Sequence, residues 1–345
     1  LVAYNEGGLR FERRQYVTCK GPEQVYSISA ADPDGDGDLD LYATRYVKGG
    51  VAGGVPTPYY DAHNGASNAY FRNDAGTLVD ATAEVGLDLG NDRFSLASLW
   101  EDFDRDGDLD LYVTNDFGQN NLYRNEGGRF TDVAAAMGAE DLAASMGVSA
   151  ADVDIDGDID LYISNMFSAP GSRIASQPQF MPGAPLEVRA HYARHGKGNT
   201  LLLARGDGSF EDASARSQTA PGGWAWGAMF GDFENDGLAD IVVPNGFVTT
   251  KDPRDLESFF WRCVVAASPL EPPASEEYQR AWIAVSMLSQ EEGYSWNGRE
   301  RNHAYWNLGA GRFADASYAT GLDFSDDARV ASVGDWEGDG RLDLW

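Results

Sequence analysis

Cysteine, histidine and long apolar runs are scarce in this chain of 345 residues. Its two cysteines, Cys19 and Cys263, allow at most one disulfide, and the sequence does not show whether they meet. No run of 18 apolar residues occurs, so we expect no membrane-spanning helix. The chain begins at Leu1 without a signal-like segment, and we expect it to be processed or trimmed.

Motifs of familiar catalytic chemistry are also missing. The sequence holds no zinc-protease motif, nucleophile elbow, Walker loop or dinucleotide fingerprint. Among four histidines, His191 and His195 have the spacing of a metal-binding pair, but a position on the surface of a helix explains them more simply. We therefore predict that the protein is not an enzyme.

Basic residues are few, because 26 Lys and Arg stand against 55 Asp and Glu, for a net charge of -29. Repeated acidic loops hold 20 of these acids, so the rest of the chain carries only about -9. Five bound calcium ions would leave a charge of about -19, which repels DNA and anionic membranes. We predict no nucleic-acid partner.

The abundant feature is an acidic loop of the form D-x-[DE]-x-D-G-x-x-D, which occurs five times. Carboxylates at positions 1, 3, 5 and 9 and a carbonyl at position 7 are oxygen donors that Ca²⁺ prefers, and the glycine at position 6 permits a sharp turn. Like charges this close repel unless a dication lies among them. The sequence therefore predicts about five Ca²⁺ ions. The predicted ligand positions are Asp32, Asp34, Asp36, Asp38 and Asp40; Asp102, Asp104, Asp106, Asp108 and Asp110; Asp152, Asp154, Asp156, Asp158 and Asp160; Asp232, Glu234, Asp236, Leu238 and Asp240; and Asp335, Glu337, Asp339, Arg341 and Asp343.

These loops differ from EF-hands. An EF-hand carries a glutamate at position 12 and a helix on each side, whereas position 12 is Ala43, Val113, Ile163 or Val243 in the first four loops, within strand-like runs. Each acidic loop is therefore predicted to join two strands.

Hairpin phrases with glycine turns alternate with the acidic loops. Counting strands gives a two-stranded start, four units of four strands and a two-stranded end, with a period near 50 residues. We predict an all-β fold, a β-propeller of four-stranded blades with five repeats visible and five to seven blades in all. One domain, 1–345, is expected to hold repeat units at about 1–48, 66–117, 118–165, 196–247 and 302–345.

Two partly helical insertions, 166–195 and 248–301, interrupt the repeats. A helix is expected over 185–192 in the first. In the second, Asp252 is predicted to cap a helix with Pro253 in its first turn, and another helix is predicted to begin at Ser275. This helical hairpin either covers the flank or rim of the propeller or offers a docking surface to a partner.

Several phrases resemble the FG-GAP/VCBS repeat proteins, and within them the cartilage acidic protein-like branch that often carries an ASPIC/UnbV segment. The phrases are DFDRDGDLDLYV at 102–113, NLYRN at 121–125 and GWAWG at 223–227, with QPQF at 177–180 and SFFWR at 258–262 in the insertions. The resemblance implies a calcium-binding propeller like that of integrin α-chains, exported from the cell and used in adhesion, matrix or complex assembly.

The same resemblance assigns ligand roles to Asp32, Asp34, Asp36 and Asp40 and to their equivalents in later loops. Glutamate replaces aspartate at position 3 in the fourth and fifth loops, so we expect weaker sites there. The family usually builds about seven blades. The chain is therefore expected to be a fragment of a longer ring or, alternatively, a ring of five blades that the first hairpin completes.

Two functions stay open. The first is a structural, adhesion or protein-interaction module that binds a protein partner or assembles with itself, and the second is a carbohydrate-binding or polysaccharide-active propeller. Trp100, Trp224 and Trp226 either fill space between blades or stack on sugar rings. Calcium loops of this kind suit millimolar calcium, which favours a secreted, cell-surface or periplasmic location.

Overall fold

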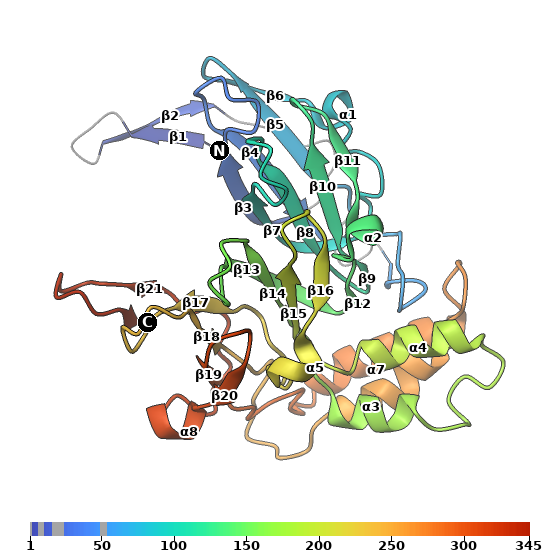
Figure 1. The fold of residues 1–345 in the computed structure, drawn as a ribbon. Coiled ribbons are helices and arrows are strands. Elements are labelled where there is room, and N and C mark those ends of the chain that lie inside the picture. Colours follow the sequence, from blue (N-terminus) through green and yellow to red (C-terminus); the bar gives the residue numbers. More distant parts are fainter. Residues whose placement is uncertain (1, 6–9, 16–23, 49–53) are drawn as a thin grey trace.

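Four antiparallel sheets of four strands each make up most of the molecule (Figure 1). The computed structural model describes residues 2–5, 10–15, 24–48 and 54–345. Each sheet consists of the two strands around an acidic loop followed by the two strands of the next hairpin. In chain order the strands are β3 (Val25–Ala31), β4 (Asp40–Arg45), β5 (Ala69–Asp74) and β6 (Thr77–Asp80); β7 (Phe94–Glu101), β8 (Asp110–Asp116), β10 (Asn121–Asn125) and β11 (Phe130–Asp132); β13 (Ser145–Ala151), β14 (Asp160–Asn165), β15 (Thr200–Ala204) and β16 (Phe210–Asp212); and β17 (Met229–Gly231), β18 (Asp240–Val243), β19 (His303–Asn307) and β20 (Phe313–Asp315).

Two-stranded sheets precede and follow these four. They are β1 (Val2–Asn5) with β2 (Phe11–Gln15), and β21 (Val333–Gly334) with β22 (Asp343–Leu344); a further pair, β9 (Gly118–Gln119) with β12 (Leu142–Ala143), lies between the second and third sheets. The prediction of a mostly β repeat fold with four-stranded units is confirmed.

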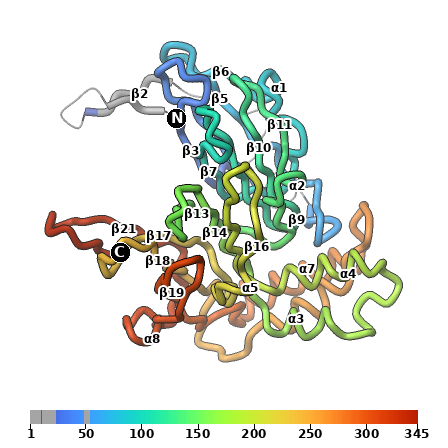
Figure 2. The backbone as a smooth tube through the Cα atoms, viewed as in Figure 1, coloured from blue at the N-terminus to red at the C-terminus, as the bar shows by residue number. Residues whose placement is uncertain are grey.

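The first strands of successive sheets lie side by side, because β3 contacts β7, β7 contacts β13 and β13 contacts β17. Small side chains permit this approach: the Oγ atoms of Ser29 and Ser98 are 2.8 Å apart across β3 and β7. The sheets follow one another in an arc (Figure 2). In the part of the chain that is described, β1 and β2 do not pair with β21 or β22, so closure of a five-bladed ring by the first hairpin is not confirmed.

The sheets are offset by two strands from the units expected in the sequence. Unit 66–117, for example, begins with β5 and ends with β8, so it combines half of one sheet with half of the next. A sheet begins at the strand before an acidic loop because the loop returns the chain directly alongside that strand.

Apolar side chains between neighbouring sheets form the core. The second strand of each sheet is central and buried on both faces, which explains its Leu-Tyr-Val type of sequence without polar alternation. Tyr112 and Tyr162 are fully buried in these strands, and their hydroxyls donate to the carbonyls of Ala139 and Thr219 at 2.9 and 2.7 Å. Each tyrosine thereby reaches the segment that leads into the following sheet.

A one-turn helix follows the last strand of every four-stranded sheet, which the sequence analysis did not foresee. The aspartate that closes the hairpin starts it, since Asp132 Oδ1 accepts from the backbone N–H of Ala134 at 3.1 Å and Asp212 Oδ1 accepts from that of Ser214 at 2.9 Å. Asp80 and Asp315 make the same contact after the first and fourth sheets, with the N–H groups of Thr82 and Ser317. These helices are α1 (Thr82–Val85), α2 (Ala134–Met137), α5 (Ser214–Ser217) and α8 (Ser317–Thr320).

Longer helices lie in the two insertions and gather on one side of the molecule (Figure 1). The first insertion holds α3 (Ala169–Ala175) and α4 (Leu186–Arg194), and the second holds α6 (Glu257–Phe259), a π-helical turn (Phe260–Val264), a 3-10 turn (Val265–Ala267) and α7 (Glu276–Gln290). Ser275 caps α7 as predicted, with its hydroxyl accepting from the N–H of Tyr278 at 3.2 Å. Tyr278 and Val285 are fully buried, so α7 covers the core with one face.

The predicted cap at Asp252 is wrong. Its carboxylate accepts from the backbone N–H of Arg254 at 2.9 Å, which forms a local turn before the helix. Leu256 is the N-cap residue of α6 and makes no capping hydrogen bond with its side chain. Asp255 forms a turn like that of Asp252, because its Oδ1 accepts from the N–H of Glu257 at 2.8 Å. Both aspartates therefore form turns of the same kind ahead of α6, and neither is its N-cap.

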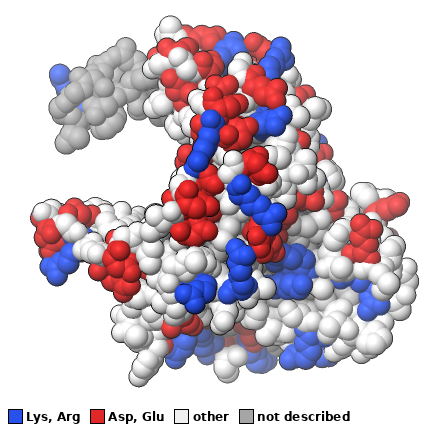
Figure 3. Space-filling model, in the orientation of Figure 1, with Lys and Arg blue, Asp and Glu red and all other residues white. Residues whose placement is uncertain are grey.

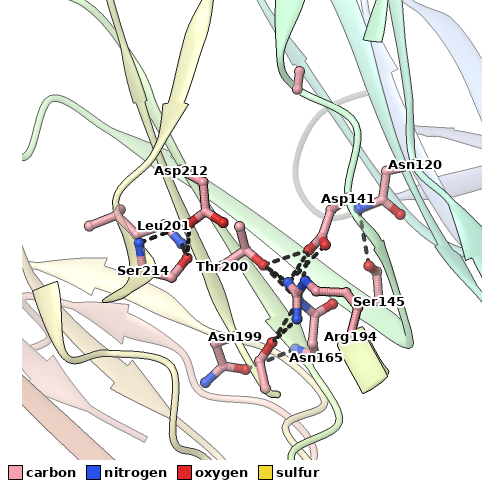
Figure 4. Close-up of polar contacts among 12 residues, drawn as sticks. Asn120, Asp141, Ser145, Asn165, Arg194, Asn199, Thr200, Leu201, Asp212 and Ser214 are labelled. Carbon is pink, nitrogen blue, oxygen red and sulfur yellow. Dashed lines mark hydrogen bonds and ion pairs between the residues drawn. The ribbon is translucent and has the colours of Figure 1, made fainter. Parts of the chain in front are cut away.

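A buried polar network anchors the first insertion to the third sheet (Figure 4). Asp141 is 4% exposed and forms an ion pair of 2.8 Å with Arg194 at the end of α4. The same carboxylate accepts hydrogen bonds from Asn165 Nδ2 at 2.9 Å and from Thr200 Oγ1 at 2.6 Å. One acid therefore joins the insertion to β14 and β15.

His195 is fully buried, so its predicted place on the surface of a helix is wrong. Its Nε2 lies 3.2 Å from the carbonyl oxygen of Tyr60, which identifies Nε2 as the donor and leaves Nδ1 unprotonated and without a partner. Burial lowers the pKa of His195 to about 3. Within the described residues, His191 and His195 belong to no group of three metal-ligating side chains.

Two further expectations concern membranes and cysteines. None of the helices in the described residues has both the length and the apolar character needed to cross a membrane. The possible pairing of Cys19 with Cys263 falls outside the described residues, since Cys19 is not among them.

The buried histidine makes stability depend on pH. The pKa of His195 is about 3 in the folded chain and 6.5 in the unfolded chain. The contribution of the neutral His195 side chain to the free energy of unfolding is therefore complete above pH 6.5 and is lost as the pH falls below that value. We expect the free energy of unfolding to fall by about 1.4 kcal/mol per pH unit relative to His195→Gln between pH 6.5 and pH 5. Denaturant unfolding measures this difference, with the exposed His63→Gln as control; parallel curves for wild type and His195→Gln would contradict it.

Candidate metal centres

All five acidic loops share one local geometry. The aspartate at position 1 accepts from the backbone N–H groups of positions 5 and 6, and the aspartate at position 5 accepts from the N–H of position 7. In the second loop these distances are 3.1 Å from Asp106 N to Asp102 Oδ1, 3.1 Å from Gly107 N to Asp102 Oδ2 and 2.9 Å from Asp108 N to Asp106 Oδ1. The equivalent acceptors in the other loops are Asp32 and Asp36, Asp152 and Asp156, Asp232 and Asp236, and Asp335 and Asp339.

Glycine at position 6 is needed for this turn. Gly107 has φ +98° and Gly157 has φ +89°, in the left-handed region that residues with a Cβ rarely adopt. The loop backbone is thereby curled so that its N–H groups point at the first carboxylate. The loops that join β3 to β4, β7 to β8 and β13 to β14 lie on one face of the molecule, where Figure 3 shows acidic side chains in a band with basic ones among them.

Three of the loops bring carboxylate oxygens of several acids close together. In the described residues, three groups of acids each place their ligand atoms within 4.8 Å of one another. They are Asp32, Asp34 and Asp36 in the first loop, Asp102, Asp104 and Asp110 in the second, and Asp152, Asp154 and Asp160 in the third.

The aspartate at position 9 has a second task that the sequence analysis missed. Asp110 is 2% exposed, and its Oδ2 accepts from Phe103 N at position 2 of the same loop at 3.2 Å. Its Oδ1 accepts from Asn125 N on the third strand of the sheet at 2.8 Å. This carboxylate therefore fixes the loop to the following hairpin. Asp160 and Asp240 repeat both contacts.

In the first loop the aspartate at position 9 cannot bind the N–H of position 2, because that residue is Pro33, which has no N–H to donate. The hydroxyl of Tyr70 donates to Asp40 Oδ2 instead, and Asn73 N donates to Asp40 Oδ1 at 2.7 Å. In the second sheet the position of Tyr70 is taken by Leu122, where the loop supplies its own N–H. The two substitutions thus compensate one another.

Asparagines in the hairpins connect neighbouring sheets. Asn125 Nδ2 donates to the carbonyl of Leu109 at 3.1 Å and to that of Pro33, in the acidic loop of the preceding sheet, at 2.8 Å. Asn307 makes the same pair of contacts, to Ala239 and to Val153 in the third loop. The recurrence of Asn in the hairpin phrase was visible in the sequence, but its partner lies about ninety residues or more away.

Burial and mutual repulsion make these carboxylates costly to ionise. Burial, together with the charge of the neighbouring Asp104 or Asp154, raises the pKa of Asp110 and of Asp160 to about 7. Burial and the adjacent Asp106 also raise the pKa of Asp104. A cation among the carboxylates offsets both effects, and oxygen-only donors suit a hard divalent ion. The residues present therefore fit a metal site in the first three loops.

The fourth and fifth loops are less complete. Within the described residues no group of three clustered acids includes a residue of either loop. Position 3 is Glu234 in the fourth loop and Glu337 in the fifth. In the fifth loop, Arg341 pairs with Asp339 at 2.5 Å and so competes for a predicted ligand. The expectation that these two sites are weaker stays a prediction.

In the second and third loops the side chain at position 7 binds another group, which leaves its backbone carbonyl to a metal. Asp108 Oδ2 accepts from Gly127 N at 2.8 Å. Asp158 forms an ion pair of 2.5 Å with Arg105, which joins the second and third loops. Their carboxylates are thus held away from the first and third ligand positions.

The compensation at Pro33 predicts unequal effects of two Tyr→Phe changes. We expect Tyr70→Phe to cost about 1.5–3 kcal/mol, because it leaves an oxygen of a buried carboxylate without a donor. Tyr123→Phe is the matched control, since it removes a buried hydroxyl that donates to the carbonyl of Leu89 at 3.1 Å, and we expect it to cost about 0.5–1.5 kcal/mol. Denaturant unfolding measures both; equal costs would show that Tyr70 does not replace the missing N–H.

Comparison with known proteins places the loops in a family context. The model of the FG-GAP-like repeat matches residues 102–163 and 191–243, which include the second, third and fourth acidic loops. A search of curated proteins finds no match. Two solved structures are similar at a distance: an Agrocybe aegerita lectin that recognises non-reducing terminal N-acetylglucosamine (15% identity, 90% of this chain and 72% of that chain, TM-score 0.32), and the Bacillus licheniformis rhamnogalacturonan lyase PL11 (16% identity, 64% and 44%, TM-score 0.26). The two matched segments, with the loop geometry they contain, support an FG-GAP/VCBS repeat protein.

Proposed function

We propose that this protein is a calcium-binding propeller module with a structural, adhesive or protein-interaction role outside the cytosol. The observation that carries the proposal is the convergence of three carboxylates in each of three successive loops, on backbones curled in the same way. Calcium would be held by Asp32, Asp34 and Asp36 and by the equivalent groups of the second and third loops, with position 7 carbonyls as further donors. The ion supplies positive charge that offsets the repulsion between these acids.

The contacts of the acidic loops with hairpins and neighbouring sheets suggest that bound calcium stabilises the packing of the sheets. The loop carboxylates fix each loop to its own hairpin, and the hairpin asparagines fix it to the neighbouring sheet. An ion that orders a loop would therefore stiffen the contact between sheets. A stiff array of sheets is a suitable platform for a protein partner or for self-assembly, and loops of this donor type fill where calcium is millimolar. This favours a secreted, cell-surface or periplasmic protein.

A non-catalytic role forms part of the proposal. Carboxylates bound to a dication stay ionised and cannot serve as general acids near neutral pH. The alternative, a carbohydrate-binding or polysaccharide-active propeller, requires a pocket in which an acid, a base and exposed aromatic rings meet. The cavity lined mainly by aromatic rings has one carboxyl group and, among its described lining residues, no His, Lys or Arg.

Calcium removal tests the bracing role. Three sites with dissociation constants of about 10⁻⁴ M would together contribute about 4 kcal/mol in millimolar calcium. We therefore expect excess EGTA to lower the Tm by roughly 5–10 °C. Calorimetry with and without EGTA measures the change, and restoring calcium in excess is the control. A Tm that does not move with EGTA would refute calcium bracing.

Two substitutions in the second loop test which carboxylates bind calcium through their side chains. We expect Asp104→Asn to remove about one bound calcium ion per chain, because Asp104 belongs to the clustered group and makes only a weak loop contact of 3.3 Å with Asp106 N. Asp108→Asn removes the same charge from the same loop but should leave the stoichiometry unchanged, since its carboxylate is bound to Gly127 N. Isothermal titration calorimetry counts the ions; equal losses in both variants would contradict the assignment.

A further inference from the structure

A cavity of about 330 Å³ lies next to the first strands of three sheets, β3, β7 and β13. It is at the ends of these strands that lie away from the acidic loops. Tyr26, Leu96 and Met146 line it from the starts of β3, β7 and β13, whereas the acidic loops follow the last residues of the same strands. The segment between β4 and β5 closes the other side through Tyr59, and the second insertion does so through residues such as Trp282. Tyr26 is 52% exposed, so the edge of the cavity reaches the surface.

Aromatic rings dominate this cavity, because ten of its fifteen lining residues are Tyr, Phe or Trp. Trp224 and Phe247 stack with ring centroids 4.6 Å apart, and Tyr59 meets Phe117 edge to face at 4.9 Å. The volume suits a small organic molecule. Rings on several sides give such a molecule many π faces and edges to contact.

These rings already attract a cation elsewhere in the same cluster. The guanidinium carbon of Arg329 lies 4.6 Å from the centroid of the Trp226 ring and 5.6 Å from that of Phe247. Both rings also line the cavity, but Arg329 is not among its lining residues. The electron-rich faces of this cluster therefore favour positive charge, as expected for tryptophan and phenylalanine.

The charged side chain that lines the cavity is an acid, Asp116. It is 6% exposed, and its Oδ2 accepts a hydrogen bond of 2.6 Å from the hydroxyl of Tyr46. The ion pairs found among the described residues do not include it. Burial raises the pKa of Asp116 to about 7, as expected for a carboxyl without a cationic partner. A cation in the cavity would supply the missing partner.

A neutral sugar fits these surroundings poorly. Sugar hydroxyls need several donors and acceptors, and the lining offers mainly aromatic carbon and the side chains of Leu96, Met146 and Met166. A neutral apolar ligand would fill the volume but would leave Asp116 unpaired. An organic cation satisfies both the rings and the carboxylate.

We propose that this cavity binds a small organic cation with a substituted ammonium group, which lies against the aromatic rings and pairs with the Asp116 carboxylate. This site goes beyond the proposed calcium-dependent function, since its lining residues belong to none of the acidic loops. The ligand carries one positive charge and enough apolar surface to displace water from the rings.

Choline and tetramethylammonium are suitable probes, and 3,3-dimethylbutan-1-ol is the neutral counterpart of choline with the same shape. We expect both cations to bind saturably to the calcium-loaded chain and to change tryptophan fluorescence, because four tryptophans line the cavity. Choline should bind at least about tenfold more tightly than the alcohol. Equal binding of the alcohol would indicate a neutral apolar ligand and overturn the proposal, as would no binding of either cation up to about 20 mM.

The carboxylate is tested by Asp116→Asn, which keeps the shape and an acceptor for the Tyr46 hydroxyl. We expect choline affinity to fall by about tenfold or more while the affinity for the alcohol is unchanged. Asp88→Asn, at an exposed acid, removes the same net charge and should leave choline binding unaltered. Unchanged choline affinity in Asp116→Asn would overturn the role of the carboxylate. If this variant does not fold, the comparison of choline with the alcohol on the wild-type chain decides the question.

Discussion

Everything in the architecture depends on how the acidic loops satisfy closely spaced carboxylates. Backbone N–H groups of the same loop bind the first and fifth positions, and the ninth reaches across to the next hairpin. These contacts hold several like charges within a few ångströms, which is costly without a cation. The same contacts that gather these carboxylates therefore also align the strands of each sheet.

The side chains at the two ends of β3, β7 and β13 differ in chemical character. One end carries the acidic loops, whose oxygens are hard donors for metal ions. The other end carries the insertions and an aromatic cavity with one buried acid, Asp116. The separation follows from topology, since the strand after each acidic loop returns to the opposite end, where the insertions begin. A ligand in the cavity would contact several sheets at once, because Tyr26, Leu96 and Met146 come from three of them.

Local signals were predicted well, and signals that depend on distant contacts were not. Ser275 caps α7 as expected, because capping involves only residues within one turn. The predicted cap at Asp252 is wrong, since this residue forms a turn with Arg254 N and α6 begins only at Glu257. His195 was expected at a helix surface, but the helix lies against Tyr59 and Tyr60 of a segment more than a hundred residues earlier.

The sequence alone determined the acidic loops, the strands on either side of them and the hairpins between them, because each depends on the spacing of a few neighbouring residues. Tyr70 and Asp141 show what it did not determine. Tyr70 serves Asp40 only because Pro33 lacks an N–H, and Asp141 binds Arg194 only because α4 folds back onto the third sheet. Partners of this kind are selected by folded distances rather than by position in the chain. The tertiary structure therefore decided which polar groups are buried together, and it alone placed Asp116 among aromatic rings.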